Sequence, residues 1–477
     1  MGKAINMQDN YYSSKEFKTL LKQYEAAWQQ GGSVYFDPDQ LTDIAEYYYG
    51  AGQHQQSLHT IEHALSIFPD ATAPLIFMAR HELVFRKNTK LARQYLEKIT
   101  DTTDLEYIYL YAEILINENK TDEAEAYLQE AYKKLNDEDD LADFVLDVAN
   151  MYADYDQPAL ARQWLNKSDE PHLADYKEIE GRIAISQGQY KKSEDIFNKL
   201  LDENPYSTPY WNHLASSQLR RNHISEAITS SEYSIAINPN DAEAILNKAN
   251  GLYALTNFDE ALHYYKRFTQ LCPDEHTGYL LQGITLLSLN QPEQALSQLL
   301  QAEKRLAEGA EALLDVYNEI AFTLSLLNRI DEALAYIDKA EKLEKADKSL
   351  LHVMRGNILL QHEQTNEALR QFQIATNMPT STDNTLYHIA ISLYDCGHIE
   401  LARDMFDTLV YNVNQDQGTD GYAYLAACYD ELGHHEQYLR HLKKACAVNP
   451  NETRTVFFDE FPPDLPPEEY YNYALRQ

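Results

Sequence analysis

Two histidines near the start of the chain have the spacing to bind a metal ion. His59 and His63 are four residues apart in the segment HTIEH, so on a helix both imidazoles would lie on one face. The zinc-protease motif needs a glutamate directly after the first histidine, and Thr60 stands there instead. We therefore expect a surface pair, with adventitious metal binding as the alternative.

A second group joins three histidines and a cysteine near the carboxyl end. His434 and His435 fall at a predicted turn, His441 follows them, and Cys446 falls among the packing positions of the next helix. Imidazole and thiolate are ligands that zinc prefers. These positions favour structural roles, and a zinc site is the alternative.

Catalytic motifs would be the other source of chemistry. The sequence has no glycine-rich phosphate loop, no Gly-x-Ser-x-Gly and no His-Glu-x-x-His. Carboxylates are abundant, but 75 Asp and Glu residues in a chain of 477 make any pair of them uninformative about acid–base catalysis. We therefore expect a protein that is not an enzyme, with no catalytic residue, no cofactor and no metal.

The charge of the chain restricts its partners. Its 40 Lys and Arg residues against 75 Asp and Glu give a formal net charge of −35, which repels nucleic acid and anionic membranes. The amino terminus lacks the apolar core of a secretory signal, and no segment is long and apolar enough to span a membrane. Four scattered cysteines are typical of reduced thiols. We expect a cytoplasmic protein that binds neither nucleic acid nor membrane.

A repeat of about 34 residues organises most of the chain. Twelve units start near residues 38, 72, 105, 142, 174, 208, 242, 276, 314, 349, 383 and 419, and the eighth residue of every unit is small. Small residues there let two antiparallel helices approach closely. The eighth residues are Ala45, Ala79, Ala112, Ala149, Gly181, Ala215, Ala249, Gly283, Ala321, Gly356, Ala390 and Ala426.

Three further positions repeat in the same register. Position 20 is again Ala or Ser in most units, and position 15, where the first helix must end, often holds Gly or Asn, as in Gly188 and Asn222. These two residue types tolerate the left-handed backbone that ends a helix. Prolines such as Pro239 and Pro273 occupy position 32 and end the second helix. The pattern therefore predicts a series of helix pairs.

This pattern resembles the tetratricopeptide repeat, with its Trp-x2-Leu-Gly-x2-Tyr…Ala-x3-Phe…Pro consensus. Trp211 matches the leading tryptophan, and Phe197, Phe372 and Phe406 match the phenylalanine at position 24. The resemblance covers residues 38–452 and implies a long, bacterial-type array of about twelve repeats. The implied fold is all-α: a right-handed superhelical α-solenoid of helix-turn-helix repeats.

Two flanks lie outside this array. Residues 1–37 contain an amphipathic stretch over 14–30, which predicts a helix that caps the exposed end of the first repeat. Residues 453–477 form an acidic tail rich in Pro and Tyr. We expect this tail to cap the last repeat, with binding of a partner or of the array itself as the alternative.

The resemblance implies that the first helices line a concave groove and expose positions 2, 5, 6, 9, 12 and 13. Acids and tyrosines predominate at these positions, and only Arg80, Arg182 and Arg220 are basic. Carboxylates attract Lys and Arg, and tyrosine rings stack on guanidinium groups. The residues that we predict to bind a partner are Asp39, Asp43, Glu46, Tyr49, Glu106, Tyr109, Glu113, Asp143, Asp147, Asp154, Asp175, Glu178, Asn247, Asn250 and Tyr253.

The sequence thus predicts a non-enzymatic protein–protein interaction scaffold whose acidic, tyrosine-lined groove binds a basic peptide segment or partner protein. Two alternatives stay open. Position 2 lies in a first helical turn, where Asp and Glu favour the helix dipole whatever binds nearby, and the overall acidity raises the number of acids everywhere. The chain could also be a structural module that associates with itself through the array ends and outer helix faces.

Overall fold

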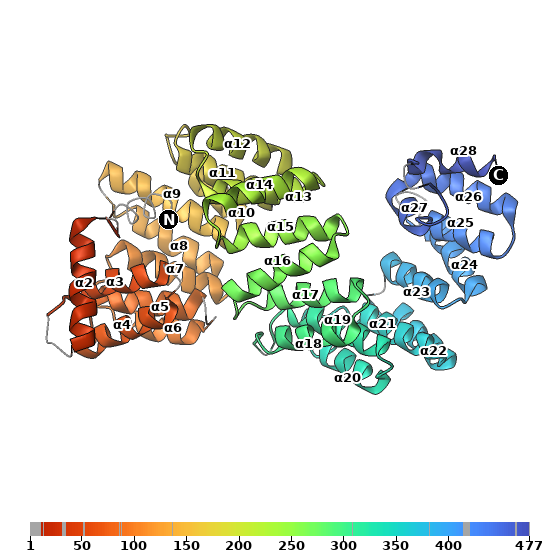
Figure 1. Cartoon of the computed structure of the whole chain (residues 1–477), viewed down its shortest axis with the longest axis horizontal. Helices are drawn as coiled ribbons and strands as arrows, with labels where there is room; N and C mark the ends of the chain where they lie inside the picture. The colour runs from red at the N-terminus through yellow and green to blue at the C-terminus, as the bar shows by residue number, and fades with distance from the viewer. Residues whose placement is uncertain are drawn as a thin grey trace. The chain divides into compact units, whose positions relative to one another are not determined.

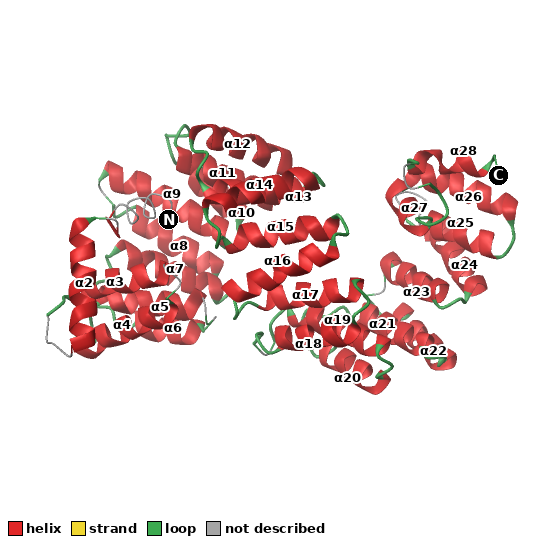
Figure 2. Cartoon of the chain, in the orientation of Figure 1, coloured by secondary structure: helices red, strands yellow, loops and turns green. Residues whose placement is uncertain are grey.

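The computed structural model consists of helices joined by short turns (Figures 1 and 2). It describes residues 11–12, 14–30, 35–50, 53–84, 86, 88–135, 137–307, 309–380, 382–413, 420–462 and 465–476. Within these residues every regular element is a helix and no strand occurs, which confirms the predicted all-α helical-repeat solenoid. In the same part of the chain, no helix is both long and apolar enough to cross a membrane.

The chain divides into two compact units, Met1–Asn238 and Pro239–Gln477. The N-terminal unit starts with the single helix α2 (Lys15–Gln30), followed in its described residues by six helix pairs. The pairs are α3 (Pro38–Gly50) with α4 (His54–Ile67), α5 (Thr72–Val84) with α6 (Thr89–Leu96), α7 (Leu105–Asn117) with α8 (Thr121–Tyr132), α9 (Glu138–Asp154) with α10 (Pro158–Leu165), α11 (Ala174–Ser186) with α12 (Tyr190–Glu203), and α13 (Thr208–Arg220) with α14 (Ile224–Ile237).

The C-terminal unit also has six described helix pairs, followed by short helices. The pairs are α15 (Ala242–Ala254) with α16 (Phe258–Leu271), α17 (His276–Ser288) with α18 (Pro292–Glu303), α19 (Leu313–Leu326) with α20 (Ile330–Ala340), α21 (Lys348–Gln361) with α22 (Thr365–Thr376), α23 (Asp383–Asp395) with α24 (Ile399–Thr408), and α25 (Tyr422–Glu431) with α26 (His435–Val448). A π-helical turn, η1 (Leu409–Val413), follows α24, and α27 (Pro450–Val456), η2 (Pro467–Glu469) and α28 (Tyr470–Ala474) end the described chain.

Small residues form the contact between the two helices of a pair. Ala215 and Ala227, at positions 8 and 20 of one unit, are both 0% exposed. Where position 8 is glycine, a large side chain of the second helix fills the space: a Cβ added to Gly356 would lie only 2.3 Å from Cε1 of Phe372. The repeating small residues therefore set how closely each pair packs.

The turn inside most pairs has one residue with left-handed backbone at position 15. Gly188 has a φ of 71° and Asn222 a φ of 62°, as predicted from their types, but Thr256 takes the same conformation with a φ of 58°. Gly52, which the sequence placed in the equivalent turn of the first pair, lies outside the described residues. The turn geometry is thus common to both units, whichever residue type occupies it.

Both flanks pack against the terminal pairs. In the N-terminal unit, Phe17 of α2 is 0% exposed, and the hydroxyl of Tyr24 donates a hydrogen bond to Oγ1 of Thr60 at 3.0 Å. In the C-terminal unit, Phe457, Phe461 and Tyr470 are buried in a cluster with α25 and α26. The described part of the tail therefore covers the last helix pair.

Candidate protein-binding faces

One stripe of side chains along each first helix is left uncovered by the second helices. On α19 the stripe runs through Asp315, Glu319, Phe322 and Leu326 at positions 2, 6, 9 and 13, and all four are half-buried or exposed. Position 5, which the family resemblance placed on the open side, is more often buried than exposed. The stripe at positions 2, 6, 9 and 13 is therefore the surface that a partner can reach.

The predicted binding residues fall into three groups by exposure. Those that are exposed are Asp39, Glu106, Asp143 and Asp154. Those that are half-buried are Asp43, Glu46, Tyr49, Glu113, Asp147, Asp175, Glu178, Asn250 and Tyr253. The remaining two, Tyr109 and Asn247, are buried. All of the exposed group and most of the half-buried group lie on the first helices of the N-terminal unit, whereas Asn247, Asn250 and Tyr253 lie on α15 of the C-terminal unit.

The two buried residues depart from the expectation that they line an open groove. Tyr109 is 9% exposed because its ring packs against Phe144, with the ring centroids 5.5 Å apart, and its hydroxyl donates to Oδ2 of Asp147 at 3.1 Å. Asn247 is 8% exposed, and its side chain already interacts within the protein. Neither side chain presents its polar group to a ligand in this structure.

Three glutamates on neighbouring first helices act on one arginine, Arg80 on α5. Nη2 of Arg80 donates to Oε2 of Glu106 at 2.8 Å, and the charges of Glu46 and Glu113 also act on the guanidinium. Burial alone would lower the pKa of Arg80, but Glu113 and Glu106 raise it overall. Burial raises the pKa of Glu113 although Arg80 acts in the opposite direction. The guanidinium of Arg80 therefore interacts with more than one carboxylate.

Tyrosine hydroxyls bind several of the other acids. Tyr11 donates to Oδ2 of Asp43 at 2.9 Å, and Tyr12 donates to Oε2 of Glu46 at 3.0 Å. These bonds lower the pKa of both carboxyls, but burial is the larger effect and raises it. A tyrosine hydroxyl can thus donate a hydrogen bond to a carboxylate of the same protein. Tyr109, which was predicted to contact a partner, does this with Asp147.

A second arginine neutralises the far end of this surface. Nη1 of Arg182 on α11 donates to Oδ1 of Asn150 on α9 at 2.5 Å, and Nη2 pairs with Asp154. We call the whole surface the acidic face. It consists of Asp39, Asp43, Glu46, Arg80, Glu106, Glu113, Asp143, Asp147, Asp154, Asp175, Glu178 and Arg182. Carboxylates greatly outnumber the two arginines on it.

The same stripe in the C-terminal unit has a different chemistry, which the sequence analysis missed. On each of three successive first helices two of its four members are apolar, and we call these six residues the apolar face: Leu281 and Ile284 on α17, Phe322 and Leu326 on α19, and Leu350 and Met354 on α21. Comparing positions 2, 6, 9 and 13 between the two halves of the chain would have found it from the sequence.

The histidine groups take part in side-chain packing. His59 and His63 are exposed on α4, and the ring of His63 lies edge-on to Trp28 at 6.2 Å. His441 is 3% exposed, stacks on Tyr429 and receives a hydrogen bond of 2.7 Å from the hydroxyl of Tyr411, with its other nitrogen on a backbone carbonyl. Among the described residues, no three His, Cys, Asp or Glu side chains are arranged to bind a metal.

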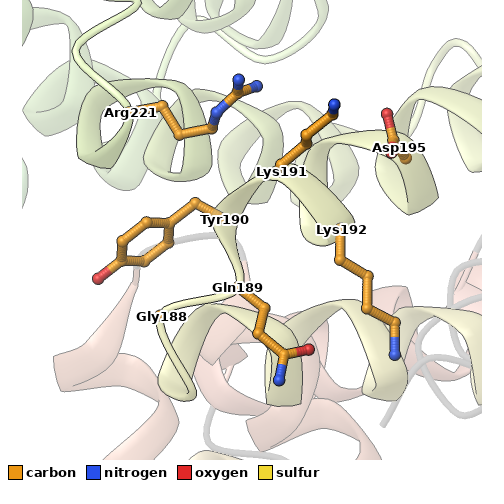
Figure 3. A pocket seen from close by; sticks show the side chains of 7 residues that line it. All are labelled: Gly188, Gln189, Tyr190, Lys191, Lys192, Asp195 and Arg221. Atoms are coloured by element: carbon orange, nitrogen blue, oxygen red, sulfur yellow. The ribbon is translucent and has the colours of Figure 1, made fainter.

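A shallow hollow lies beside the start of α12 (Figure 3). Lys191, Lys192 and Asp195 come from α12, and Arg221 follows α13. Nζ of Lys192 pairs with Glu180 at 2.9 Å, and Arg221 pairs with Glu194. Two of its three cations are therefore engaged within the protein, and the hollow has no set of groups suited to catalysis.

Sequence models of the tetratricopeptide repeat match two segments of the chain, residues 246–311 and residues 314–347. The chain therefore contains tetratricopeptide repeats. Both matched segments lie in the C-terminal unit. Tetratricopeptide repeats are protein-binding modules, which supports a scaffold for protein–protein interaction.

Two curated proteins are similar to this tetratricopeptide repeat protein. The anaphase-promoting complex subunit 7 of Dictyostelium discoideum is 24% identical over 285 residues, which are 59% of this chain and 44% of that protein. The protein O-mannosyl-transferase TMTC3 of Homo sapiens is 23% identical over 227 residues, which are 38% of this chain and 25% of that protein. The chain spans less than half the length of either relative.

Solved structures of tetratricopeptide proteins are also similar. The Cut9–Hcn1 hetero-tetramer of the anaphase-promoting complex matches with a TM-score of 0.38 and 15% identity, over 98% of this chain and 95% of that one. A thermophilic tetratricopeptide protein from Thermus thermophilus matches with a TM-score of 0.34 and 22% identity, over 39% of this chain and 100% of that one.

Proposed function

We propose that the acidic face of the N-terminal unit binds a basic segment of a partner protein. The observation that carries the proposal is the imbalance around Arg80, where Glu46, Glu106 and Glu113 share a single guanidinium. Burial raises the pKa of Glu46 and Glu113, so each carboxylate is held in a site that disfavours its charge. A lysine or arginine from a partner would restore the balance.

The rest of the acidic face supports the same partner. Asp39 and Asp143 lie exposed at the edges, and Asp175 is half-buried on α11. Carboxylates on four first helices, α3, α7, α9 and α11, suit an extended segment with several cations, because charges spaced along a surface attract oppositely charged chains and repel phosphate. This is why we expect a protein partner and no nucleic acid.

The proposal also covers assembly, catalysis and cellular location. One curated relative is by its name a subunit of a complex, which agrees with a scaffold that works as part of an assembly. The other is named as a transferase, but the match covers 25% of that protein, so we keep the expectation that this chain does no chemistry itself. We place the protein in the cytoplasm because its four cysteines carry free thiols.

The proposal can be tested with a short fluorescent peptide of Arg and Lys separated by Gly and Ser. Anisotropy would measure its affinity for the wild type at about 0.05 M and about 0.5 M salt, which screens exposed charges. The variant Glu113→Gln, Asp143→Asn, Asp175→Asn removes three charges with little change in shape. We expect binding about tenfold weaker, since losing three ion pairs at about 0.5 kcal/mol each approaches the 1.4 kcal/mol that corresponds to a factor of ten.

The matched control carries the same change in charge on second helices. Asp122 and Glu123 on α8 and Asp202 on α12 are exposed and lie outside the acidic face. Their variant, Asp122→Asn, Glu123→Gln, Asp202→Asn, should bind the peptide as the wild type does. Equal losses in the two variants would mean that only the net charge attracts the peptide, and the proposal would fail.

A further inference from the structure

We propose that the apolar face of the C-terminal unit is a second docking surface, and that its occupant is an amphipathic partner segment carrying Lys or Arg beside its apolar side chains. This inference uses the scaffold role of the protein but not the acidic face. The two docking surfaces are on different compact units and differ in chemistry, so either proposal can fail without the other.

The apolar face is one continuous surface, because successive first helices contact one another, with position 12 of one helix meeting position 13 of the next. The hydroxyls of Tyr253 on α15 and Ser288 on α17 are 3.1 Å apart, and Oγ of Ser325 on α19 donates to Oε1 of Gln361 on α21 at 3.0 Å. Between them, Leu280 of α17 packs against the core cluster of α19. The stripes of α17, α19 and α21 therefore lie side by side.

Nothing in the described part of the chain covers this surface. Phe322 is 41% exposed and Leu326 is 52% exposed, one helical turn apart at the centre of the face. Leu281, Ile284 and Met354 beside them are half-buried. Large apolar side chains gathered on adjacent helices are unfavourable in water, and such patches mark interaction sites on soluble proteins.

The charges around the face select the occupant. In α15, α17, α19 and α21, positions 2, 5, 6, 9, 12 and 13 hold no Lys or Arg, whereas Asp315 and Glu319 stand on the same stripe as Phe322. Burial and then the carboxylate of Asp315 raise the pKa of Glu319, as expected for neighbouring acids without a cation between them. A partner that brings both apolar anchors and cations fits this surface best.

The test uses a fluorescent helix-forming peptide of Leu, Met, Lys and Ala, with Leu and Met at every third and fourth position. A peptide of the same composition in scrambled order is the control probe. Anisotropy is measured at about 0.5 M salt, where exposed charge pairs are screened and apolar contacts persist. The variant Phe322→Ala, Leu326→Ala should bind the amphipathic peptide at least tenfold more weakly, since central apolar anchors dominate such interfaces.

The matched control variant is Leu369→Ala, Ile374→Ala on α22, where both side chains are similarly exposed, at 39% and 42%, but belong to a second helix. It should bind as the wild type does, and the acidic-face variant should too. Binding that is unchanged by Phe322→Ala, Leu326→Ala, or lost equally in the control, would overturn the proposal. So would equal affinity for the scrambled peptide.

A second copy of the chain is the competing occupant, and light scattering distinguishes it. If the mass of the wild type rises with protein concentration and that rise disappears in Phe322→Ala, Leu326→Ala, the face is a self-association surface and the proposed occupant is wrong. If the mass is the same in both proteins while the peptide affinity differs, the surface binds a partner segment.

Discussion

The two compact units pack their helix pairs in the same way, but the exposed stripes of their first helices differ in chemistry. In both, small residues at positions 8 and 20 bring the helices of each pair together, and the turn between them has a left-handed residue at position 15. At positions 2, 6, 9 and 13, α3 to α11 of the N-terminal unit carry many carboxylates with Arg80 and Arg182, whereas α17, α19 and α21 of the C-terminal unit carry Leu, Ile, Phe and Met beside fewer acids. Positions that build the pair are thus separate from the positions that the second helices leave uncovered.

The links between successive first helices differ in the same way. In the N-terminal unit they include ion pairs, as in Arg80 with Glu106 and Arg182 with Asp154. In the C-terminal unit they are neutral, as between Ser325 and Gln361. Charged links depend on salt and on protonation, and neutral ones much less. The N-terminal unit should therefore respond more strongly to changes in its stripe.

The largest expected difference in stability comes from replacing one residue at repeat position 9 in each compact unit, Arg80 in the N-terminal unit and Phe322 in the C-terminal unit. Arg80→Met should lower the free energy of unfolding by about 2 kcal/mol, because Glu46, Glu106 and Glu113 would face one another without a cation. A fully buried pair would cost more, but the side chain of Arg80 is 30% exposed. Phe322→Met should change the free energy of unfolding by less than about 1 kcal/mol, as substitutions at most exposed sites do.

Urea denaturation followed by circular dichroism measures both losses, and hydrogen exchange shows where each arises. In Arg80→Met, faster exchange should be confined to α5, α7 and their neighbours. Equal losses in Arg80→Met and Phe322→Met would show that the two stripes contribute alike to stability, and the contrast drawn between the units would be wrong.

Much of this fold could be predicted from the sequence, because its determinants are local and repeated. A small residue at position 8 can pack only against a close neighbour, so twelve such residues in one register predict helix pairs whatever else each unit contains. The exposed stripe was predicted less well. Tyr109 has the residue type of a binding residue, but only the structure shows its hydroxyl on Asp147 and its ring against Phe144.

The apolar face was missed for a different physical reason. Leu281, Ile284 and Met354 have the residue types of a helix core, and only their positions in the repeat distinguish them from the apolar residues that the pair covers. Acids stand out against such a background, since their presence in a folded protein implies a surface. Residue types alone therefore predicted the acidic face but not the apolar face.

A smaller effect concerns the pH dependence of the acidic face. Burial raises the pKa of Glu113 in the folded protein, opposed by Arg80 and assisted by Glu106 and Asp154. Between the unfolded and folded pKa values, the folded state binds more protons, so this residue's contribution to stability falls as the pH rises through that range. Wild type should therefore lose stability relative to Glu113→Gln on going from acidic to neutral pH.

Urea midpoints measured at several pH values test this sign. Glu123→Gln on α8, an exposed site outside the face, is the control and should follow the wild type at every pH. If the wild type instead gained stability over Glu113→Gln as the pH rose, Arg80 would dominate burial at this site. The acidic face would then be balanced internally and would not require a partner's cation.

The smallest effect tests the construction that the two units share. Thr256 holds a φ of 58° in the turn between α15 and α16, a conformation that a β-branched residue adopts at a cost of about 1–2 kcal/mol. Glycine removes that strain but gains freedom in the unfolded chain, so Thr256→Gly should raise stability by about 0.5–1 kcal/mol. Asn222→Gly, in the equivalent turn of the N-terminal unit, should change little because asparagine tolerates this backbone. Thermal unfolding measures both, and a Thr256→Gly protein no more stable than Asn222→Gly would mean that the turns of the two units are not under the same constraint.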